Sequence, residues 1–321
     1  MTPHTMTNYP LSTWLKLLLL ALVWGSSFML IKKGLLSYTP TEVAALRLAA
    51  AAAALAPFAL WRLRTVKGKQ WLVLLSVGMT GSLLPAFLFA FAQTQLDSGV
   101  TGTLNALTPL FTLIIGALLF SQWVSRRTIV GLGIGFAGTL LLVLVQGNGL
   151  VALNAYALFI VLATLCYGLN LNFIKNYLPN LSPVTITGVS LLMVLPVAVL
   201  YLAGPADVVN KLASGPQAWW SLLAVVTLGV IGTALALVLF NHLVQIASAI
   251  FASSVTYLIP IVAITLGVLD GELISIYQVA GMALILFGVW SANRQPCTPV
   301  AGANAATVSE SLDDLEADEA R

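Results

Sequence analysis

The chain has 321 residues, of which 59% are hydrophobic and only 8% are charged, and its mean hydropathy is +0.98. Soluble domains carry about 25% charged residues, so this composition excludes a water-soluble globular protein and predicts an all-α polytopic membrane protein. The formal net charge of +3 combines a basic membrane body with an acidic C-terminal tail, and neither feature indicates a nucleic-acid partner.

Ten apolar stretches follow one another along the chain. A hydrocarbon core of about 30 Å needs roughly 20 apolar residues per helix, and on that scale the sequence predicts ten transmembrane helices with short connections. They cover residues 13–32, 41–61, 71–95, 98–120, 127–146, 151–173, 183–203, 217–242, 248–269 and 275–293. Residues 1–12 form a short N-terminal segment. Residues 294–321 form an acidic tail that is too poor in apolar residues to fold alone.

Two helix starts carry recognisable capping residues. Thr39 precedes Pro40 and is followed three positions later by Glu42, which predicts an N-cap, a proline at the first helical position and a capping box. Ser182 and Pro183 repeat the first two features of this pattern. The second and seventh helices are therefore expected to begin at these prolines.

The distribution of basic residues predicts the orientation in the membrane. With the N-terminus inside, nine Lys and Arg residues lie on the cytoplasmic side and three lie outside, namely Lys32, Lys33 and Lys211. This excess predicts a multi-pass protein of the inner membrane with both termini in the cytoplasm. Lys32 and Lys33 stand at a helix end, where we expect their side chains to snorkel to the interface.

A seventeen-residue segment occurs twice. WGSSFMLIKKGLLSYTP at 24–40 corresponds to YGLNLNFIKNYLPNLSP at 167–183 with an offset of 143, and later residues such as Gly81 and Gly232 correspond with an offset of 151. The segments 13–146 and 151–293 then hold five predicted helices each. Because five is odd, the second segment enters the membrane from the opposite side, which predicts an inverted-topology repeat of the kind found in secondary transporters.

Several motifs resemble the EamA-type permeases of the drug/metabolite transporter superfamily. They are WGSSF at 24–28, PTEVAALR at 40–47, the prolines Pro109 and Pro260, and DGELISIYQVAGMALILFGV at 270–289. The resemblance covers about residues 13–293. It implies ten helices, a central cavity between the halves, and export or exchange of small metabolites, without pointing to one substrate. The chain departs from strict duplication at Arg47, whose counterpart is Ser190.

Arg47 is the most informative single residue. It lies seven positions past Pro40, which is about 10 Å along a helix, and a charge at that depth usually faces protein or a water-filled cavity. It is a candidate anchor for an anionic group of the substrate. The alternatives are a residue that stabilises one conformation and a purely structural cation. Glu42 is five residues away and on another helix face, so capping explains it better than pairing with Arg47.

Polar and aromatic side chains within the apolar spans are the candidates for a substrate cavity. The set is Trp24, Ser27, Arg47, Gln93, Asn105, Tyr167, Asn170, Asn241, Ser253 and Tyr257. For each polar member, a structural hydrogen bond between helices is an equally good explanation. Pro109 and Pro260 are hinge candidates, although membrane helices also tolerate proline without movement. His242 is a candidate proton-coupling residue, with an interfacial hydrogen bond as the alternative. Asp270 and Glu272 are expected to serve a loop or a helix start.

The predicted function is secondary transport of a small organic metabolite, such as an amino acid or a related compound, by alternating access. Export is the expected direction, and protons are a candidate coupling ion. The two cysteines, Cys166 and Cys297, and the two histidines offer no metal-ligand spacing, so no metal, cofactor or enzymatic activity is expected. A channel or a scaffold is the alternative, and an intramembrane enzyme is a weaker one. The oligomeric state stays open.

Overall fold

A computed structural model describes residues 10–121, 126–144, 154–246 and 255–293. The described residues form helices and no β-strand. Seven helices are long and apolar enough to cross a membrane, and three shorter apolar helices, Ile129–Leu141, Leu258–Leu269 and Val279–Gly288, fall within the remaining expected spans. The prediction of an all-α polytopic membrane protein is confirmed.

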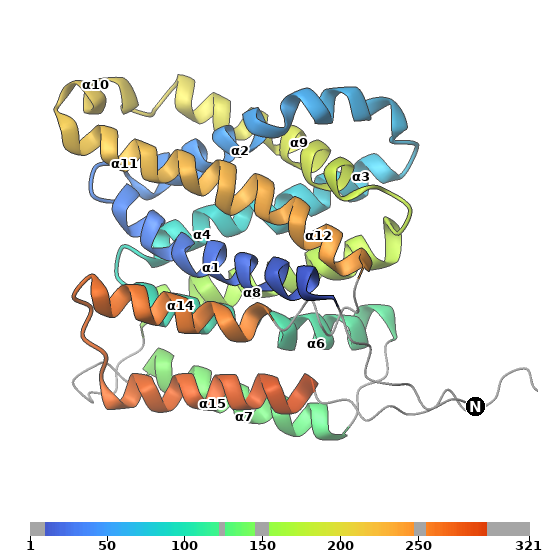
Figure 1. Ribbon diagram of the computed structural model, residues 1–321, viewed down its shortest axis with the longest axis vertical. Helices are drawn as coiled ribbons and strands as arrows, with labels where there is room; N and C mark the ends of the chain where they lie inside the picture. Colours follow the sequence, from blue (N-terminus) through green and yellow to red (C-terminus); the bar gives the residue numbers. More distant parts are fainter. Residues whose placement is uncertain (1–9, 122–125, 145–153, 247–254, 294–321) are drawn as a thin grey trace, which may run out of the picture.

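The helices lie side by side, mostly along one common direction (Figure 1). In the first half of the chain, residues 10–144, they are α1 (Leu11–Gly34), α2 (Pro40–Arg62), η1 (Leu63–Thr65), α3 (Gln70–Gly78), η2 (Met79–Leu83), α4 (Leu84–Ala92), α5 (Ser98–Asn105), α6 (Thr108–Phe120) and α7 (Arg126–Leu144). In the second half, residues 154–293, they are α8 (Ala155–Tyr177), α9 (Pro183–Ala203), α10 (Val208–Ala213), α11 (Pro216–Thr227), η3 (Leu228–Leu235), α12 (Ala236–Ile246), α14 (Val255–Leu269) and α15 (Ile276–Asn293).

The predicted helix starts of α2 and α9 are confirmed. The Thr39 side chain accepts a hydrogen bond from the Glu42 backbone N–H, and the Glu42 carboxylate accepts one from the Thr39 N–H, which completes the capping box. Ser182 likewise accepts a hydrogen bond from the Thr185 N–H at the start of α9. Each cap thus satisfies one of the orphan N–H groups of its first turn.

Two of the long helices contain a π-helical segment. η2 leads directly into Pro85, which has no N–H and crowds the carbonyl four residues before it, so the preceding turn widens. In η3, the Thr233 hydroxyl donates a hydrogen bond of 3.1 Å to the Leu228 carbonyl five residues earlier. A further interruption lies at Ala106 and Leu107, between α5 and α6. Such irregular segments are frequent at functional sites.

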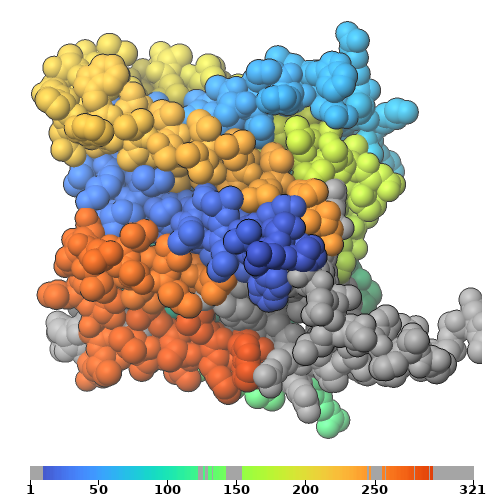
Figure 2. Space-filling model, viewed as in Figure 1, coloured from blue at the N-terminus to red at the C-terminus, as the bar shows by residue number. Residues whose placement is uncertain are grey.

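The packing of the two halves follows a repeated pattern. α1 lies between α11–α12 and α14, all from the second half, and it fills the middle of the face shown in Figure 2. α8 lies in the same way between α3–α4 and α6 of the first half. α2 packs on α9, and α7 packs on α15. Each half is therefore buried largely against the other.

Glycines at corresponding positions permit the close contacts. A Cβ added at Gly81 would lie 2.8 Å from the Asn170 side chain, and one added at Gly232 would lie 2.9 Å from the Ser27 hydroxyl oxygen. Asn170 and Ser27 correspond through the offset of 143, and Gly81 and Gly232 through the offset of 151. The same contact between the halves is thus made twice, with the roles of the halves exchanged.

The shared glycine spacing of α7 and α15 belongs to their packing within the chain. A Cβ added at Gly288 would meet the backbone of Gly135, whereas one added at Gly133 would meet nothing within 4 Å. We expect Gly288→Val to lower the unfolding temperature of the purified protein, because overpacking costs about 1–3 kcal/mol. Gly133→Ala, on the open side of α7, is the control and is expected to leave that temperature unchanged or slightly raised. Equal unfolding temperatures of the two variants would contradict the close contact between α7 and α15.

The bundle has two distinct ends. The connections 35–39, 93–97, 204–215 and 270–275 meet at one end, on the left in Figure 1, which we call the Tyr38 end. Tyr38 marks it through a hydrogen bond of 3.0 Å from its hydroxyl to the Ala218 carbonyl. The connections 63–69 and 178–182 meet at the opposite end, which we call the Lys67 end, where Val66 and Leu178 join one apolar cluster.

Candidate functional site

Arg47 lies inside the bundle, between α2, η3 and α8. Its Nε donates a hydrogen bond of 2.8 Å to the Thr233 hydroxyl, and that hydroxyl donates onward to the Leu228 carbonyl. The Tyr167 side chain on α8 interacts with the same guanidinium. A guanidinium has five N–H donors, and the bond to Thr233 uses one of them. The arrangement presents a fixed positive charge with donors suited to a carboxylate.

Two aromatic pairs flank this charge and correspond through the repeat. Trp24 of α1 packs against Phe240 of α12 with ring centroids 5.1 Å apart, and Tyr167 of α8 packs against Phe89 of α4 at 6.0 Å. Trp24 corresponds to Tyr167, and Phe89 corresponds to Phe240. The Trp24 indole also donates a hydrogen bond of 3.1 Å to the Gly232 carbonyl in η3. The Tyr167 ring thus lies at the guanidinium itself, and the Trp24 ring lies against η3 at the residue before Thr233.

Three buried amide oxygens lack a hydrogen-bond partner among the described residues. Two of them are Asn170 Oδ1 on α8 and Asn105 Oδ1 at the end of α5, and the third is Gln93 Oε1 after α4. Buried acceptors are normally satisfied, so the oxygens of Asn170 and Asn105 are available to a donor on a bound molecule. Ser27 is less available, because its hydroxyl donates to the Val23 carbonyl at 2.8 Å.

Other predicted cavity residues lie away from Arg47. Gln93 stands at the end of α4, at the Tyr38 end, where its Nε2 donates to the Phe28 carbonyl at 2.9 Å. Asn241 of α12 donates to the Thr187 hydroxyl at 3.1 Å, one turn from the Lys67 end of α9. Both amides therefore join helices to each other. Their assignment to a substrate cavity stays a prediction.

The remaining predicted residues are placed as follows. His242 has an exposed side chain, and Tyr257 belongs to α14, with its side chain outside the described set. Ser253 lies outside the described residues altogether. Pro109 is at the second position of α6, directly after the interruption at residues 106–107, and Pro260 lies inside α14.

An apolar cavity of about 310 Å³ lies elsewhere, between α6, α7 and α8. Its lining includes Leu110, Phe136 and Val161, and Thr139 is its one polar side chain among the described lining residues. It contains none of the predicted site residues. Within the described part of the chain, no cluster of three His, Cys, Asp or Glu side chains is placed to hold a metal ion.

Ion pairs gather at the Tyr38 end. Lys32 binds both Asp270 and Glu272 at 2.9 Å, and Lys33 binds Asp270. Carboxylates from the α14–α15 connection hold both lysines, a pairing that the sequence did not predict. Glu272 also accepts hydrogen bonds from the backbone N–H groups of Ser98 (3.0 Å) and Gly99 (3.2 Å). The expected helix-start role of Glu272 is present, but it serves α5 rather than the helix that follows it in sequence.

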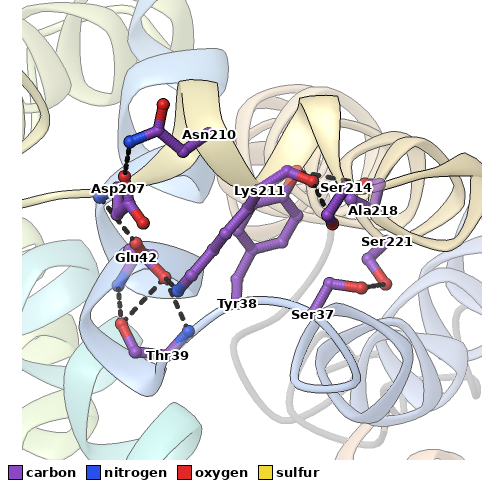
Figure 3. Close-up of polar contacts among 10 residues, drawn as sticks. All are labelled: Ser37, Tyr38, Thr39, Glu42, Asp207, Asn210, Lys211, Ser214, Ala218 and Ser221. Atoms are coloured by element: carbon purple, nitrogen blue, oxygen red, sulfur yellow. Dashed lines mark hydrogen bonds and ion pairs between the residues drawn. The ribbon is translucent and has the colours of Figure 1, made fainter.

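A second ion pair joins α2 to α10 (Figure 3). Lys211 reaches across the Tyr38 ring to the Glu42 carboxylate, and the ammonium nitrogen lies 6.0 Å from the ring centroid. Glu42 also accepts a hydrogen bond of 3.0 Å from the Asp207 backbone N–H. Glu42 thus combines its capping role with a contact between the two halves, and it does not pair with Arg47.

The charges at this end predict how stability depends on pH. Burial alone would raise the pKa of Glu272, but hydrogen bonds from Lys32, Ser98 and Gly99 lower it below its ordinary value of 4.5. Hydrogen bonds from Lys33 and then Lys32 lower the pKa of Asp270 below 3.8. A carboxylate with a lowered pKa contributes stability above its ordinary pKa, and this stability is lost as the pH falls through the folded-state pKa.

We therefore expect the unfolding temperature to lose the contribution of these two groups only below about pH 4.5. Asp97 acts in the opposite direction, because burial and then the charge of Glu272 raise its pKa. The measurement is the unfolding temperature of the wild type and of Glu272→Gln between pH 7 and pH 3.5. The difference in unfolding temperature between the wild type and Glu272→Gln should shrink as the pH falls. A constant difference over that range would contradict this assignment.

The EamA-like transporter family matches the chain twice, over residues 11–144 and 154–294. An uncharacterized transporter of Archaeoglobus fulgidus is 26% identical over 283 residues, which cover 88% of this chain and 99% of the relative. The uncharacterized inner membrane transporter YedA of Escherichia coli is 29% identical, covering 84% and 87%. A Salmonella typhimurium protein named "Probable amino-acid metabolite efflux pump" is 26% identical, covering 85% and 92%.

The fold also matches a solved structure. A crystal structure superposes with a TM-score of 0.61 at 17% sequence identity, covering 88% of this chain and 97% of the other. At that identity, the likeness concerns the arrangement of the helices alone.

Proposed function

The chain belongs to the EamA-like transporter family, and on that premise we propose that it is a secondary transporter that exports a small organic metabolite carrying a carboxylate. The observation that carries the proposal is the Arg47 charge, bound to Thr233 and flanked by the pairs Trp24–Phe240 and Tyr167–Phe89. A half-buried cation beside aromatic side chains suits a molecule with one anionic group and an apolar body.

The unpartnered oxygens of Asn170 and Asn105 suit a donor group on the same molecule, such as an ammonium or a hydroxyl. An amino acid or a related metabolite combines all of these features. The name of the Salmonella relative, an amino-acid metabolite efflux pump, supports this substrate class. Trp24, Ser27, Arg47, Asn105, Tyr167 and Asn170 are the proposed site residues.

The proposed topology has ten membrane spans in two inverted five-helix repeats, 13–146 and 151–293. The repeated contacts support it, since α1 meets α14 as α8 meets α6, and the family matches each repeat separately. The excess of basic residues supports an orientation with both termini in the cytoplasm of a bacterial cell and the Tyr38 end outside. The tail after residue 293 has no role in this proposal.

Alternating access follows from the pairing of similar halves. When two halves of opposite orientation make equivalent contacts, exchanging their conformations opens one end and closes the other. The interruptions next to Pro109 and within η2 and η3 are the proposed places where the helices bend. None of the proposed site residues, all of which the structure describes, is a carboxylate that would carry a proton, so the proposal assigns no proton carrier.

Purified protein in liposomes tests the proposal. The probes are labelled amino acids, nucleosides and aromatic metabolites, each with and without a pH gradient. We expect saturable flux of one carboxylated compound class, with protein-free liposomes as the control. A response to the pH gradient would add proton coupling to the mechanism. Flux that rises linearly with concentration would indicate a channel, and the absence of flux for every class in folded protein would contradict the proposal.

A further inference from the structure

We propose that the ion pairs of the Tyr38 end hold that end of the transport pathway closed, and that Glu272 is the residue on which this closure chiefly depends. The inference rests on the proposed alternating-access function, to which it adds a conformational device. It concerns the two clusters centred on Glu42 and on Glu272.

The two carboxylates are used in the same way. Glu42 and Glu272 are 2% and 9% exposed, each accepts backbone N–H groups at the start of a helix, and each binds a lysine from the opposite half of the chain. Glu42 of the first half binds Lys211 of the second half, and Glu272 of the second half binds Lys32 of the first half. Both contacts must break if the halves separate at this end.

Glu272 joins more elements than Glu42 does. Its carboxylate contacts Lys32 of α1 and the first N–H groups of α5, while it belongs to the connection after α14. The neighbouring positions Gly99 and Gly267 have no side chains, and a Cβ added at Gly267 would collide with this carboxylate. The site is thus shaped around the carboxylate. Loss of its charge leaves Lys32 paired with Asp270 and removes the ion pair with the more deeply buried of the two carboxylates.

The corresponding positions at the Lys67 end have different chemistry. In the repeat, Lys175 corresponds to Lys32 and Thr185 corresponds to Glu42. Ser121 corresponds to Glu272. Lys175 is exposed, and in the parts of the chain that the structure describes all four ion pairs lie at the Tyr38 end.

A neutral hydrogen bond from Asn241 to Thr187 joins the helices at the Lys67 end instead. The counterparts of these two residues at the Tyr38 end are Ala90 and Ala44, which are 1% and 0% exposed. The two ends are therefore held by unlike interactions, and only closure of the Tyr38 end depends on charge.

The ion pairs lie between the Arg47 site and the Tyr38 end of the bundle. Lys32 is eight residues past Trp24 along α1, which is about 12 Å, and Glu42 precedes Arg47 by five residues, which is about 8 Å. A path from the site to this end must pass between α1–α2 and the segments that carry Lys211 and Glu272. Opening the path therefore separates the paired groups.

Distances between spin labels test the inference without any substrate. Leu36 and Leu273 are 61% and 91% exposed, one in each half at the Tyr38 end, and Lys67 and Asn180 are an exposed pair at the other end. Cys166 and Cys297 are replaced by serine, and spin-labelled cysteines are introduced at one pair of positions at a time. The distance within each pair then reports whether that end of the protein is open or closed in liposomes. We expect Glu272→Gln, which removes the charge and keeps an acceptor for one of the two N–H groups, to raise the open-to-closed ratio about tenfold or more.

Asp207→Asn is the matched control. It removes one carboxylate at the same end whose side chain accepts a hydrogen bond from Asn210 within the same half, and it should leave both distances unchanged. Lys211→Gln, which alters a side chain that is 27% exposed, serves as the second variant should Glu272→Gln fail to fold. It is expected to lengthen the 36–273 distance as well.

Glu272→Gln and Lys211→Gln distributions that match the wild type would overturn the inference, even if the wild type transports. Longer 36–273 distances in these variants and not in Asp207→Asn would support it, even if liposomes show no saturable flux and the proposed function fails. The distance measurement and the flux measurement therefore decide the two proposals separately.

Discussion

Replacing Arg47 by alanine is expected to reduce the saturable flux of a carboxylated substrate about 10- to 100-fold. A hydrogen bond to a charged group contributes about 1.5–3 kcal/mol, and about 1.4 kcal/mol corresponds to a tenfold change in affinity. The substitution also leaves the Thr233 and Tyr167 hydroxyls without the group that they bind in the wild type. The measurement is the rate of liposome uptake against substrate concentration.

Two further variants distinguish an anchor from a structural cation. Arg47→Lys keeps the charge but cannot bind a carboxylate through two parallel hydrogen bonds. Its carboxylate flux should therefore lie between that of Arg47→Ala and that of the wild type. Thr233→Val removes the acceptor of the 2.8 Å bond from Arg47 Nε and should have a smaller effect. If Arg47→Ala slowed neutral and carboxylated compounds equally, Arg47 would be a structural cation rather than the substrate anchor.

Gly229→Val is expected to have the second largest effect, because it separates η3 from α2. A Cβ at this position would lie 2.6 Å from the Arg47 carbonyl oxygen and 2.7 Å from the Ala50 Cβ. Helix backbones cannot yield locally, so η3 must shift and Thr233 moves away from the Arg47 side chain. Overpacking of this kind costs about 1–3 kcal/mol. We expect a lower unfolding temperature and at least a tenfold loss of carboxylate flux.

The repeat supplies a matched control for this variant. A Cβ at Gly78, the counterpart of Gly229, would lie 2.5 Å from the Ser190 carbonyl oxygen, and Ser190 stands where the first half has Arg47. Gly78→Val should therefore lower the unfolding temperature similarly but disturb no charged group. If Gly78→Val reduced the ratio of carboxylate flux to neutral flux as strongly as Gly229→Val does, that result would contradict the claim that η3 holds Thr233 against Arg47.

The general architecture could be predicted because its signals are local. Runs of about 20 apolar residues identify membrane helices whatever their neighbours are, and the residues Thr39 and Glu42 set a helix start within one turn. The π-helical segments could not be foreseen as readily. η2 follows from Pro85, but η3 contains no proline and depends on how Thr233 bonds to Leu228.

The candidate site was partly predictable. Arg47, Trp24 and Tyr167 stood out through depth in the membrane and through the repeat, whereas Thr233 is one of many threonines in apolar spans. Phe89 and Phe240 were missed although the signal was present, since they differ by the same 151 positions as Gly81 and Gly232. A search for aromatic residues 151 positions apart would have identified Phe89 and Phe240.

Polar residues that bind other helices could not be separated from those that line a site. Gln93 and Asn241 have the same local surroundings in the sequence as Asn170, and only their partners, Phe28 and Thr187, assign them to helix contacts. Lys32 and Glu272 are 240 residues apart. No periodicity or spacing predicts a pair at such a distance, so the ion pairs of the Tyr38 end required the three-dimensional arrangement.

Counterflow tests the alternating-access claim most directly. Liposomes that contain the protein are loaded with an excess of unlabelled substrate and then placed in a trace of labelled substrate, with empty liposomes for comparison. A carrier that exposes one site to each side in turn should take up label faster from loaded liposomes and transiently concentrate it above equilibrium. Uptake that is independent of loading and proportional to concentration would contradict a carrier and indicate a channel.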